Sequence, residues 1–408
     1  MTTRRMAPVW LMGLSNSSFG MYGGIVSVLI PQLLSAQHLP EPTIAGVTAI
    51  LVSSGFWSFL LSPVLDVRYS RRWYATVMAA MGGALLVIGL LNLHHLAVLE
   101  AAVLLGFLCA NLFQSALGGW FASITNTAQE SRLSAWSTVG NIAAGGLMAM
   151  LGGELFRYLP LPLAALLLGS LIFLPTAIFP FMPAPGPDRR LASESFPRFF
   201  REVVSLLRRR DLLIALSLFI APCAAFSLTN VLAALGNDFH ASEHTVSLVA
   251  GAGVLAGGVL GSLLFPRISG WLPLRALYLA IGVAGALFTL GLLLLPHAPA
   301  TFAVAMIGEN AFQALAIANS VAIAFEAIGR ANPLAATSYS LIISASNFSI
   351  TYMVMVDGAG YARHGLAGAL ATDAVITIVA SVLLGLLLLW LRRTPAAPAL
   401  ITAPSLES

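Results

Sequence analysis

The chain has 408 residues, of which 58% are hydrophobic and 9% are charged, and its mean hydropathy is +0.90. A water-soluble globular protein carries about a quarter of its residues as Asp, Glu, Lys and Arg. Soluble enzymes, nucleic-acid-binding proteins and disordered scaffolds are therefore excluded, although the formal net charge is +4. The two cysteines, Cys109 and Cys223, lie within apolar runs, which excludes a disulfide framework and a cysteine-based metal site.

Apolar segments long enough to cross a bilayer, about 20 residues each, recur twelve times along the chain. They cover residues 8–33, 43–65, 73–93, 97–121, 133–155 and 161–183, and then 211–235, 244–266, 275–296, 300–325, 334–357 and 368–391. The first segment follows Arg4 and Arg5, as in a signal peptide, but it is too long for a signal-peptide core and has no cleavage site of small residues. The sequence therefore predicts an all-α membrane protein with twelve transmembrane helices.

The basic residues, all twenty of them arginines, indicate the topology of these helices. If the N-terminus is inside, eighteen arginines fall on the inner side, and only Arg157 and Arg363 fall outside. This distribution obeys the positive-inside rule. We expect a multi-pass protein of a bacterial inner membrane with both termini in the cytoplasm. All seven histidines fall in the predicted outer loops: His38, His94, His95, His240, His244, His297 and His364.

A charged stretch that follows several prolines divides the apolar sequence into two parts. Residues 1–183 are predicted to form an N-terminal six-helix half, and residues 211–393 a C-terminal six-helix half. Between them, residues 184–210 have the composition of a cytoplasmic amphipathic linker that lies at the lipid surface. The tail, residues 394–408, is rich in Ala and Pro and is predicted to be disordered.

The two halves repeat each other with an offset of 199 residues. Three separate features align at this offset, which indicates two pseudo-symmetric halves, an architecture typical of transporters with a site near the midplane. The aligned features are Asn111-Leu112-Phe113-Gln114 with Asn310-Ala311-Phe312-Gln313, Arg68 and Ser70 with Arg267 and Ser269, and Ser54, Ser58 and Ser62 with Gly253, Gly257 and Gly261. The three glycines allow close helix contact, either at a rocking interface between halves or in static packing.

Glu309 is the most informative single residue, because it lies inside the tenth apolar segment. A helix that enters the membrane near Pro299 places Glu309 about 15 Å deep, close to the bilayer centre. A carboxylate there costs at least about 2.5 kcal/mol unless it is protonated, paired or in contact with water. Gln313 and Ser320 lie on roughly the same helix face. Glu309 is therefore predicted to be a proton-coupling acid, and the alternative is a structural or substrate-binding glutamate.

Paired amides on the fourth and tenth segments are candidate substrate contacts. Asn111 and Gln114 lie one turn apart, and Asn310 and Gln313 repeat the pair. Side-chain amides can both donate to and accept from a polar ligand, but they can equally join helices to one another.

The first segment combines polar residues and glycines, and it includes Asn16 and Tyr22. It is too polar for a helix that faces lipid, so we expect both side chains to line the transport pathway. Weaker candidates of the same kind are Asn141, Asn230 and Asn347.

A compact charged turn joins the second and third segments and contains Asp66, Arg68, Arg71 and Arg72. The presence of an acid among bases indicates a latch that holds an inner gate by charge pairs and helix-end dipoles. Arg267 occupies the matching turn of the second half and is assigned to gating as well. The alternative is that these arginines only anchor the inner loops.

Two further patterns in the second half have simpler interpretations. His240-Ala241-Ser242-Glu243-His244 matches an inverted zinc-protease pattern, but the loop is better explained as a helix start with Ser242 as N-cap. Asp373 is an acid in the twelfth segment. Because residues 372–391 already suffice to span a membrane, Asp373 is placed at the outer start of its helix.

With these features in view, the chain resembles the major facilitator superfamily over nearly its full length. The signature of that superfamily at the turn between helices 2 and 3 runs from Gly through Asp-Arg to Gly-Arg-Arg. Here Ser62, Asp66, Arg68, Arg71 and Arg72 stand at those places, with Ser62 replacing the first Gly. The resemblance implies alternating access, with helices 1, 4, 7 and 10 lining the cavity.

Within the superfamily, three motifs resemble the AmpG-type permeases, a group of muropeptide importers and related siderophore permeases. They are Ser62-Pro63-Val64-Leu65-Asp66, the glycines Gly140, Gly145 and Gly146, and Gly358-Ala359-Gly360-Tyr361-Ala362. Muropeptide permeases carry helices beyond twelve, so the resemblance favours a siderophore or another medium-sized solute.

The sequence therefore predicts a secondary transporter, not an enzyme, that takes up a polar solute together with protons through Glu309. Its expected partners are a small-molecule solute, protons and the lipid bilayer, with no nucleic acid, metal or cofactor, and the protein is expected to be a monomer. The alternatives are a drug or metabolite efflux carrier, a membrane-embedded enzyme that uses the outer histidines, and a sensor without transport activity.

Overall fold

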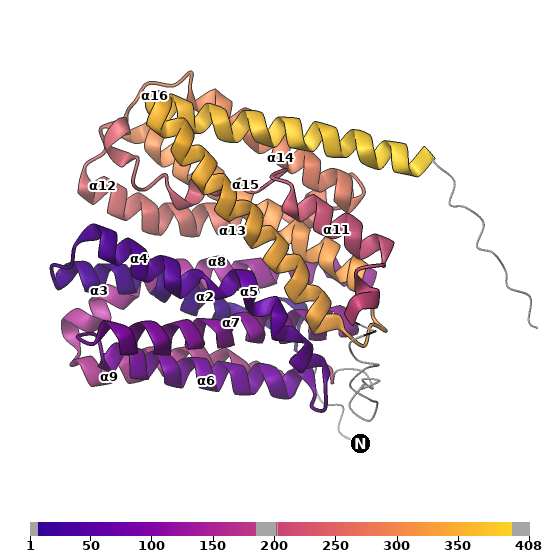
Figure 1. Cartoon of the computed structure of the whole chain (residues 1–408), viewed down its shortest axis with the longest axis horizontal. Coiled ribbons are helices and arrows are strands. Elements are labelled where there is room, and N and C mark those ends of the chain that lie inside the picture. Colours follow the sequence, from indigo (N-terminus) through magenta and orange to yellow (C-terminus); the bar gives the residue numbers. More distant parts are fainter. Residues whose placement is uncertain (1–6, 185–200, 202, 394–408) are drawn as a thin grey trace, which may run out of the picture.

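The computed structural model describes residues 7–184, 201 and 203–393, and every regular element within those residues is helical. Figure 1 shows two groups of helices packed against each other, one from the first half of the chain and one from the second. Within the described residues, nine helices are long and apolar enough to cross a membrane. The predicted all-α membrane fold is therefore confirmed.

The first group contains thirteen consecutive elements. They are α1 (Val9–Leu14), α2 (Ser17–Gly24), the π-helical η1 (Ile25–Leu29), α3 (Ile30–Ala36), α4 (Glu41–Val52), α5 (Ser54–Trp57), the 3₁₀ turns η2 (Ser58–Leu60) and η3 (Ser62–Asp66), α6 (Arg71–Leu91), α7 (Leu96–Ile124), α8 (Thr127–Tyr158), α9 (Leu161–Phe173) and the 3₁₀ helix η4 (Leu174–Phe181). The elements from α1 to α3 run on as one interrupted helix.

The second group has fewer but longer helices. They are α11 (Arg210–Ile220), the 3₁₀ turns η6 (Ser227–Asn230) and η7 (Gly236–Phe239), α12 (Glu243–Leu248), the π-helical η8 (Val249–Gly253), α13 (Val254–Ile268), α14 (Leu274–Leu292), α15 (Pro299–Ile328) and α16 (Ala335–Arg393).

The twelve predicted segments exceed the nine long helices for two reasons. First, α16 contains the eleventh and twelfth segments, which meet at a sharp bend where His364 leaves helical geometry and Gly365 has φ +61°. Glycine has no Cβ and adopts positive φ without steric cost. Second, the second and seventh segments are broken into short pieces, so neither forms a single long helix.

The prediction of a continuous seventh helix over residues 211–235 is wrong beyond Ile220, where α11 ends. Pro222 follows two residues later and removes a backbone donor. Phe226 then has φ +48°, a conformation that is rare for bulky residues. Packing holds it there: the Phe226 ring stacks on that of Phe312 of α15, with centroids 6.1 Å apart. We call residues 221–230 the unwound segment of helix 7.

Close contact with α14 also holds the unwound segment in place. A Cβ atom on Gly282 would overlap the carbonyl oxygen of Cys223, and a Cβ on Gly285 would overlap the ring of Phe226. The absence of a side chain at Gly282 therefore leaves space for the Cys223 carbonyl group, and its absence at Gly285 leaves space for the Phe226 ring.

We expect Gly282→Ala to abolish the stable fold, because its methyl group would force the Cys223 carbonyl away from α14. The matched control is Gly291→Ala on the same helix, where a Cβ atom meets no neighbour within 4 Å. The measurement is the fraction of detergent-purified protein that elutes as a single monodisperse species after heating. Equal thermal stability of the two variants would contradict the proposed packing.

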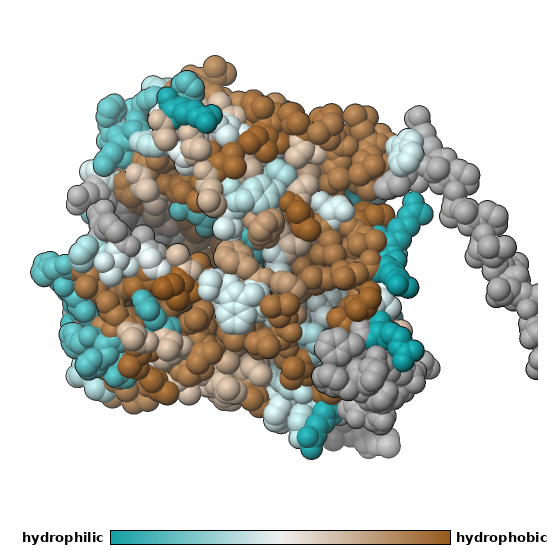
Figure 2. All heavy atoms as spheres, in the orientation of Figure 1, coloured by the Kyte–Doolittle hydropathy of each residue, from teal (hydrophilic) through white to brown (hydrophobic). Residues whose placement is uncertain are grey.

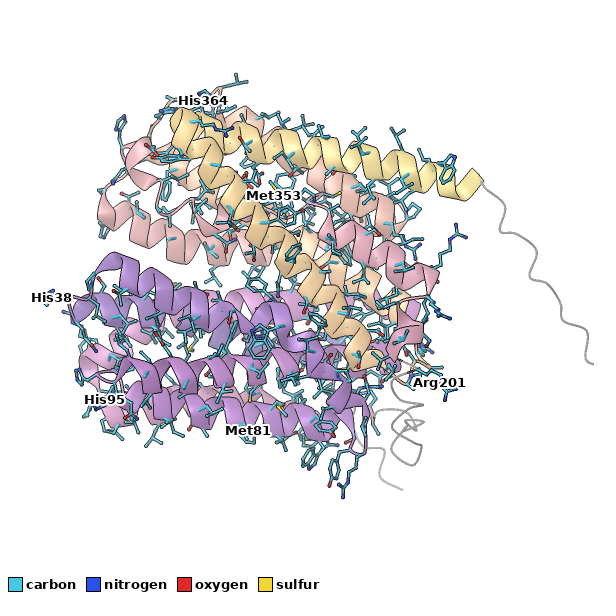
Figure 3. The ribbon with its side chains drawn as sticks, viewed as in Figure 1. His38, Met81, His95, Arg201, Met353 and His364 are labelled. Atoms are coloured by element: carbon cyan, nitrogen blue, oxygen red, sulfur yellow. The ribbon has the colours of Figure 1, made fainter. Side chains whose placement is uncertain are left out.

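The bundle has two chemically distinct ends. Figure 3 shows His38, His95 and His364 at one end, here called the histidine end, and Arg201 at the opposite arginine end. On the face that Figure 2 shows, hydrophobic residues cover most of the surface between the two ends, and hydrophilic residues gather at the ends. Leucines between the two ends are more than half exposed, for example Leu260, Leu287, Leu383 and Leu386. A continuous apolar surface of this kind is a membrane-contacting one.

Two local predictions of the sequence can be compared with the structure. Ser242 accepts a hydrogen bond from the Thr245 N–H at the start of α12, which confirms the predicted N-cap. The glycine stripe packs within one half: Cβ atoms on Gly257 and Gly261 would overlap backbone oxygens of α15. Of the two readings of the stripe, this contact favours static packing. Gly258 instead faces Ile142 of α8 in the other half.

Several predictions concern residues outside those described. Arg4, Arg5, most of the linker at 184–210 and the tail at 394–408 belong to this group. Of the linker, residues 184, 201 and 203–210 are described, and residues 203–206 are helical.

Candidate functional site

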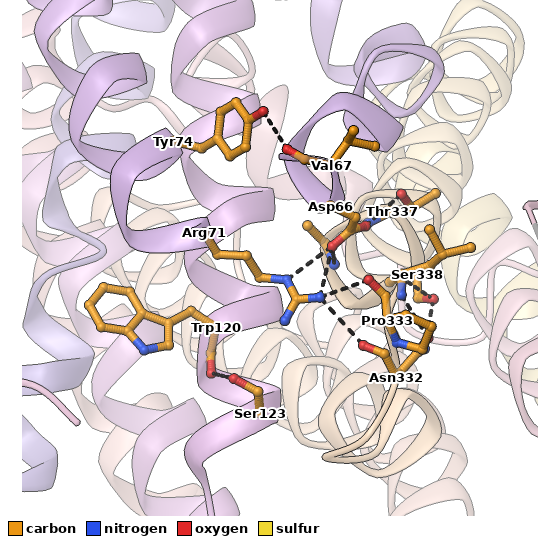
Figure 4. A network of polar contacts seen from close by, with 12 residues as sticks. Asp66, Val67, Arg71, Tyr74, Trp120, Ser123, Asn332, Pro333, Thr337 and Ser338 are labelled. Carbon is orange, nitrogen blue, oxygen red and sulfur yellow. Dashed lines mark hydrogen bonds and ion pairs between the residues drawn. The ribbon is translucent and has the colours of Figure 1, made fainter. Parts of the chain in front are cut away.

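A buried ion pair joins the two halves at the arginine end. The Arg71 guanidinium lies 2.9 Å from the Asp66 carboxylate. Asp66 also accepts the backbone N–H groups of Ala336 (3.1 Å) and Thr337 (2.8 Å) and the Thr337 hydroxyl (2.8 Å), as Figure 4 shows. Because α16 begins at Ala335, its first N–H groups have no partner within the helix and favour an anion.

Arg71 completes this contact by donating to two carbonyl oxygens of the other half, those of Pro333 (3.0 Å) and Asn332 (3.4 Å). Asp66 and Arg71 are 6% and 2% exposed. Burial of both charges is tolerated because each makes several hydrogen bonds. We call Asp66, Arg71 and the N-terminus of α16 the latch.

A second contact between the halves lies at the same end. Arg330 donates from Nε to the Thr125 carbonyl at 2.7 Å and contacts the side-chain oxygen of Asn126. The Tyr339 ring of α16 fills the space above Gly118 of α7, where a Cβ atom would collide with it. The two halves are therefore in close contact at the arginine end.

The structure also places the other predicted gating residues. Arg68 has φ +63° and lies over the ring of Tyr69, 5.3 Å from its centroid. Arg72 is partly exposed at the start of α6. Arg267 donates to the Leu263 carbonyl of its own helix at 3.3 Å. Asp66 and Arg71 are thus the predicted gating residues that carry the bonds described between the halves.

A cavity of about 80 Å³ lies between the halves, away from the latch. Five helical stretches contribute to it: the start of α2 with the residue before it, α7, α8, α15 and the part of α16 before the bend at Gly365. We call the parts of α16 before and after this bend its first and second arms. Its volume holds a few water molecules and is too small for a medium-sized solute. Polar side chains that line it include Asn16, Gln114, Asn141, Ser320 and Asn347. Two of the predicted substrate contacts, Asn16 and Gln114, are therefore brought together.

The remaining predicted amides bond within the halves. Asn111 donates to the Phe107 carbonyl of its own helix at 2.8 Å and to the Ser54 hydroxyl at 3.4 Å. Asn310 donates to the Met306 carbonyl at 2.8 Å.

Gln313 donates to the hydroxyl of Thr229, in the unwound segment, at 2.7 Å. Tyr22 is fully buried, and its ring lies 5.9 Å from that of Phe107. Its hydroxyl group occupies the space beside Gly106. Although they are aligned on one helix, the three polar residues Glu309, Gln313 and Ser320 contact different neighbours. They therefore do not form a single polar stripe.

Glu309 lies in the interior of the second half. It has no exposed surface, and its Oε1 atom lies 2.5 Å from the Thr289 hydroxyl of α14. The same hydroxyl lies 3.0 Å from the Gly285 carbonyl oxygen. The second carboxyl oxygen, Oε2, has no hydrogen-bond partner among the described residues. The cavity between the halves is lined by other side chains.

Two more buried carboxyl groups lie in the same half and flank the unwound segment. The Ser227 hydroxyl is 2.5 Å from Asp357 Oδ2 and 2.9 Å from Asp373 Oδ1. Asp357 and Asp373 are 1% and 3% exposed, and they belong to the first and second arms of α16. Both carboxyl groups interact electrostatically with Glu309.

The placement of Asp373 at the outer start of its helix is wrong. The second arm of α16 begins just after the bend at Gly365, so Asp373 lies about 12 Å along it, and it is buried inside the bundle. The sequence does not single out Asp357 for a related reason. The predicted eleventh segment ends at this residue, whereas the helix continues to the bend at Gly365. Both acids lie in sequence between apolar stretches on a Gly-Ala-rich run, and this signal could have identified them.

The comparisons with known proteins agree with this architecture. Residues 12–307 match the family model described as Major Facilitator Superfamily. No curated protein matches the chain.

Solved structures with similar folds include three transporters. The human organic anion transporter MFSD10 (TETRAN) has 16% identity and a TM-score of 0.67, covering 92% of this chain and 98% of its own. A bacterial homologue of the iron transporter ferroportin, in an outward-facing state with soaked iron, has 15% identity and a TM-score of 0.63, with 95% and 98% covered. The proton:xylose symporter XylE bound to 6-bromo-6-deoxy-D-glucose has 14% identity and a TM-score of 0.63, with 92% and 95% covered.

Proposed function

Since the chain belongs to the major facilitator superfamily, we propose that it is a secondary transporter that imports a medium-sized polar solute with protons. The arginine end would face the cytoplasm of a bacterial inner membrane, following the positive-inside rule. The protein would work as a monomer within lipid. The motifs shared with AmpG-type permeases favour a siderophore-like or muropeptide-like solute.

The hydrogen bonding of Glu309 is the observation that carries the proton-coupling part of this proposal. Thr289 has a single hydroxyl hydrogen, yet its oxygen lies within hydrogen-bond distance of two acceptors, Glu309 Oε1 and the Gly285 carbonyl. A threonine hydroxyl donates once and accepts through its lone pairs. Both contacts are hydrogen bonds if Glu309 is protonated and donates to Thr289, which then donates to Gly285. This arrangement supports a neutral, proton-carrying Glu309.

The cavity between the halves supports a polar substrate site. Asn16, Gln114, Asn141 and Asn347 present amide groups to it, and amides can both donate to and accept from polar ligands. Because the cavity is small and the arginine end is closed by the latch, we interpret this arrangement as one state of an alternating-access cycle. Solute entry would then require the halves to separate at the histidine end, where Figure 2 shows the surface indented between them.

Proton-coupled solute flux tests the proposal directly. The purified protein is reconstituted into liposomes that contain a pH-sensitive dye, and ferric siderophores, muropeptide fragments, sugars and organic anions are added outside in turn. One solute class is expected to enter and to acidify the lumen as it does so. Solute entry without acidification would overturn proton coupling. Solute entry that alkalinises the lumen would indicate exchange typical of efflux carriers. An absence of flux for every solute class would overturn import of these solutes.

For a solute found in this way, Gln114→Ala is expected to raise the half-saturating concentration several-fold, because one hydrogen bond to a ligand contributes about 0.5–1.5 kcal/mol. Gln32→Ala, at an exposed position on α3, is the matched control and should leave that concentration unchanged. Equal values for both variants would place the substrate site elsewhere.

A further inference from the structure

The strongest unexplained feature of the second half is the pair of carboxyl groups on either side of Ser227. Asp357 and Asp373 come from the two arms of α16, and Ser227 comes from the unwound segment of helix 7. The serine directly follows Phe226, the residue with φ +48°. Three separate stretches of chain therefore meet at one hydroxyl group.

The number of hydrogen atoms available does not match this geometry if both acids are ionised. Ser227 can donate one hydrogen, but its oxygen lies 2.5 Å from one carboxyl oxygen and 2.9 Å from the other. With two carboxylates, one of these contacts would place a lone pair against a lone pair. With one proton on the pair, one acid donates to Ser227, and Ser227 donates to the other.

Burial strengthens this conclusion. Asp357 is 1% exposed, and its second oxygen, Oδ1, has no hydrogen-bond partner among the described residues. An ionised carboxylate with an unpaired oxygen in such a place has a large desolvation cost. Two neighbouring carboxylates also repel each other, so one of the two holds a proton.

No positive charge compensates the pair within the described part of the chain. The ion pairs described there involve Asp66, Asp211 and Glu326, none of which belongs to this cluster. The titratable group that interacts with both members of the pair is Glu309 of α15. It is another acid and adds no cation.

We propose that Asp357 and Asp373 share one proton across Ser227 and form a second proton-binding site in addition to Glu309. The shared proton holds the unwound segment of helix 7 to both arms of α16. Loss of that proton leaves two carboxylates with one hydroxyl hydrogen, which weakens this attachment and frees the segment to move. The shared proton stands on geometry alone, whereas its use in transport rests on the proposed function.

Infrared spectroscopy of the purified protein in an ester-free detergent tests this site without a transported solute. Protonated carboxyl groups have a carbonyl stretching band separate from that of carboxylates, and its area counts protons. The double variant, Asp357→Asn with Asp373→Asn, is expected to lose one carboxyl equivalent of this band at neutral pH, because the two acids share one proton. Neither single variant should lose more than one equivalent, since the remaining buried acid can keep the proton. Glu309→Gln should remove one further equivalent.

A matched control accompanies these variants. Asp211→Asn alters an acid that is largely exposed and pairs with Arg275, and it should leave the band unchanged. If the double variant does not fold, the band of Glu309→Gln counts the protons that remain on the pair, and one equivalent is expected.

Three outcomes would overturn the proposal. The first is an unchanged band in the double variant. The second is a double variant that loses two equivalents, which would mean two independent protons. The third is loss of the wild-type band when sodium or calcium chloride is added, which would indicate a cation site. None of these outcomes depends on solute flux, so failure here is distinct from failure of the proposed function.

Discussion

Asp66→Asn is expected to open the arginine end and to raise the labelling rate of a cysteine placed there by at least tenfold. Asparagine keeps the shape of aspartate but presents an amide N–H₂ group where the carboxylate accepts from Arg71 and the start of α16. Arg71, a residue that is 2% exposed, then loses the Asp66 carboxylate that lies 2.9 Å from its guanidinium. Removing one partner of a buried pair costs about 3–5 kcal/mol, and separation of the halves relieves this cost by letting water reach Arg71.

The reporter for this experiment is Thr125→Cys, at a position that is 3% exposed at the contact with Arg330. A membrane-impermeant maleimide is applied from the arginine end, and labelling is measured with and without Asp66→Asn. The native Cys109 and Cys223 are buried. Asp211→Asn is the matched control, since exposed pairs contribute at most about 1 kcal/mol. Equal labelling rates in the Asp66 and Asp211 variants would rule out the latch.

Glu309→Gln is expected to reduce accumulation driven by a gradient of one pH unit by up to about tenfold while solute counterflow continues. Glutamine imitates the protonated acid, because its amide can donate to Thr289 as the carboxyl hydrogen does. The fold and the exchange of solute across the membrane are therefore retained. A glutamine releases no proton, however, and each coupled proton contributes up to about tenfold accumulation per pH unit of gradient.

The measurement uses proteoliposomes and the solute identified by the flux experiment. The gradient is about one pH unit, which drives about tenfold accumulation of solute for each coupled proton. Glu154→Gln, at an exposed position on α8, is the matched control and should accumulate solute as the wild-type protein does. Unchanged accumulation in Glu309→Gln would refute its assignment as a coupling acid. Loss of counterflow together with accumulation would point to a structural role.

Hydropathy alone predicts most of the architecture, because a bilayer requires about 20 apolar residues for each crossing. The long helices α6, α7, α14 and α15 lie close to their predicted positions. The unwound segment after Ile220 was not predicted. Its residues are as apolar as those of a helix, and the break depends on Pro222, on Phe226 and on the space left by glycines of α14.

The same contrast holds for the candidate sites. The sequence by itself determined the number of apolar segments, the separation of arginines from histidines and the presence of an acid, Glu309, within the tenth apolar segment. Each of these depends only on composition along the chain. Only the tertiary structure decided that Asp66 meets the start of α16, 270 residues away, and that Ser227 joins Asp357, 130 residues away. Hydrogen bonds between distant helices depend on helix rotation and on where each helix ends, and apolar periodicity specifies neither to within one residue.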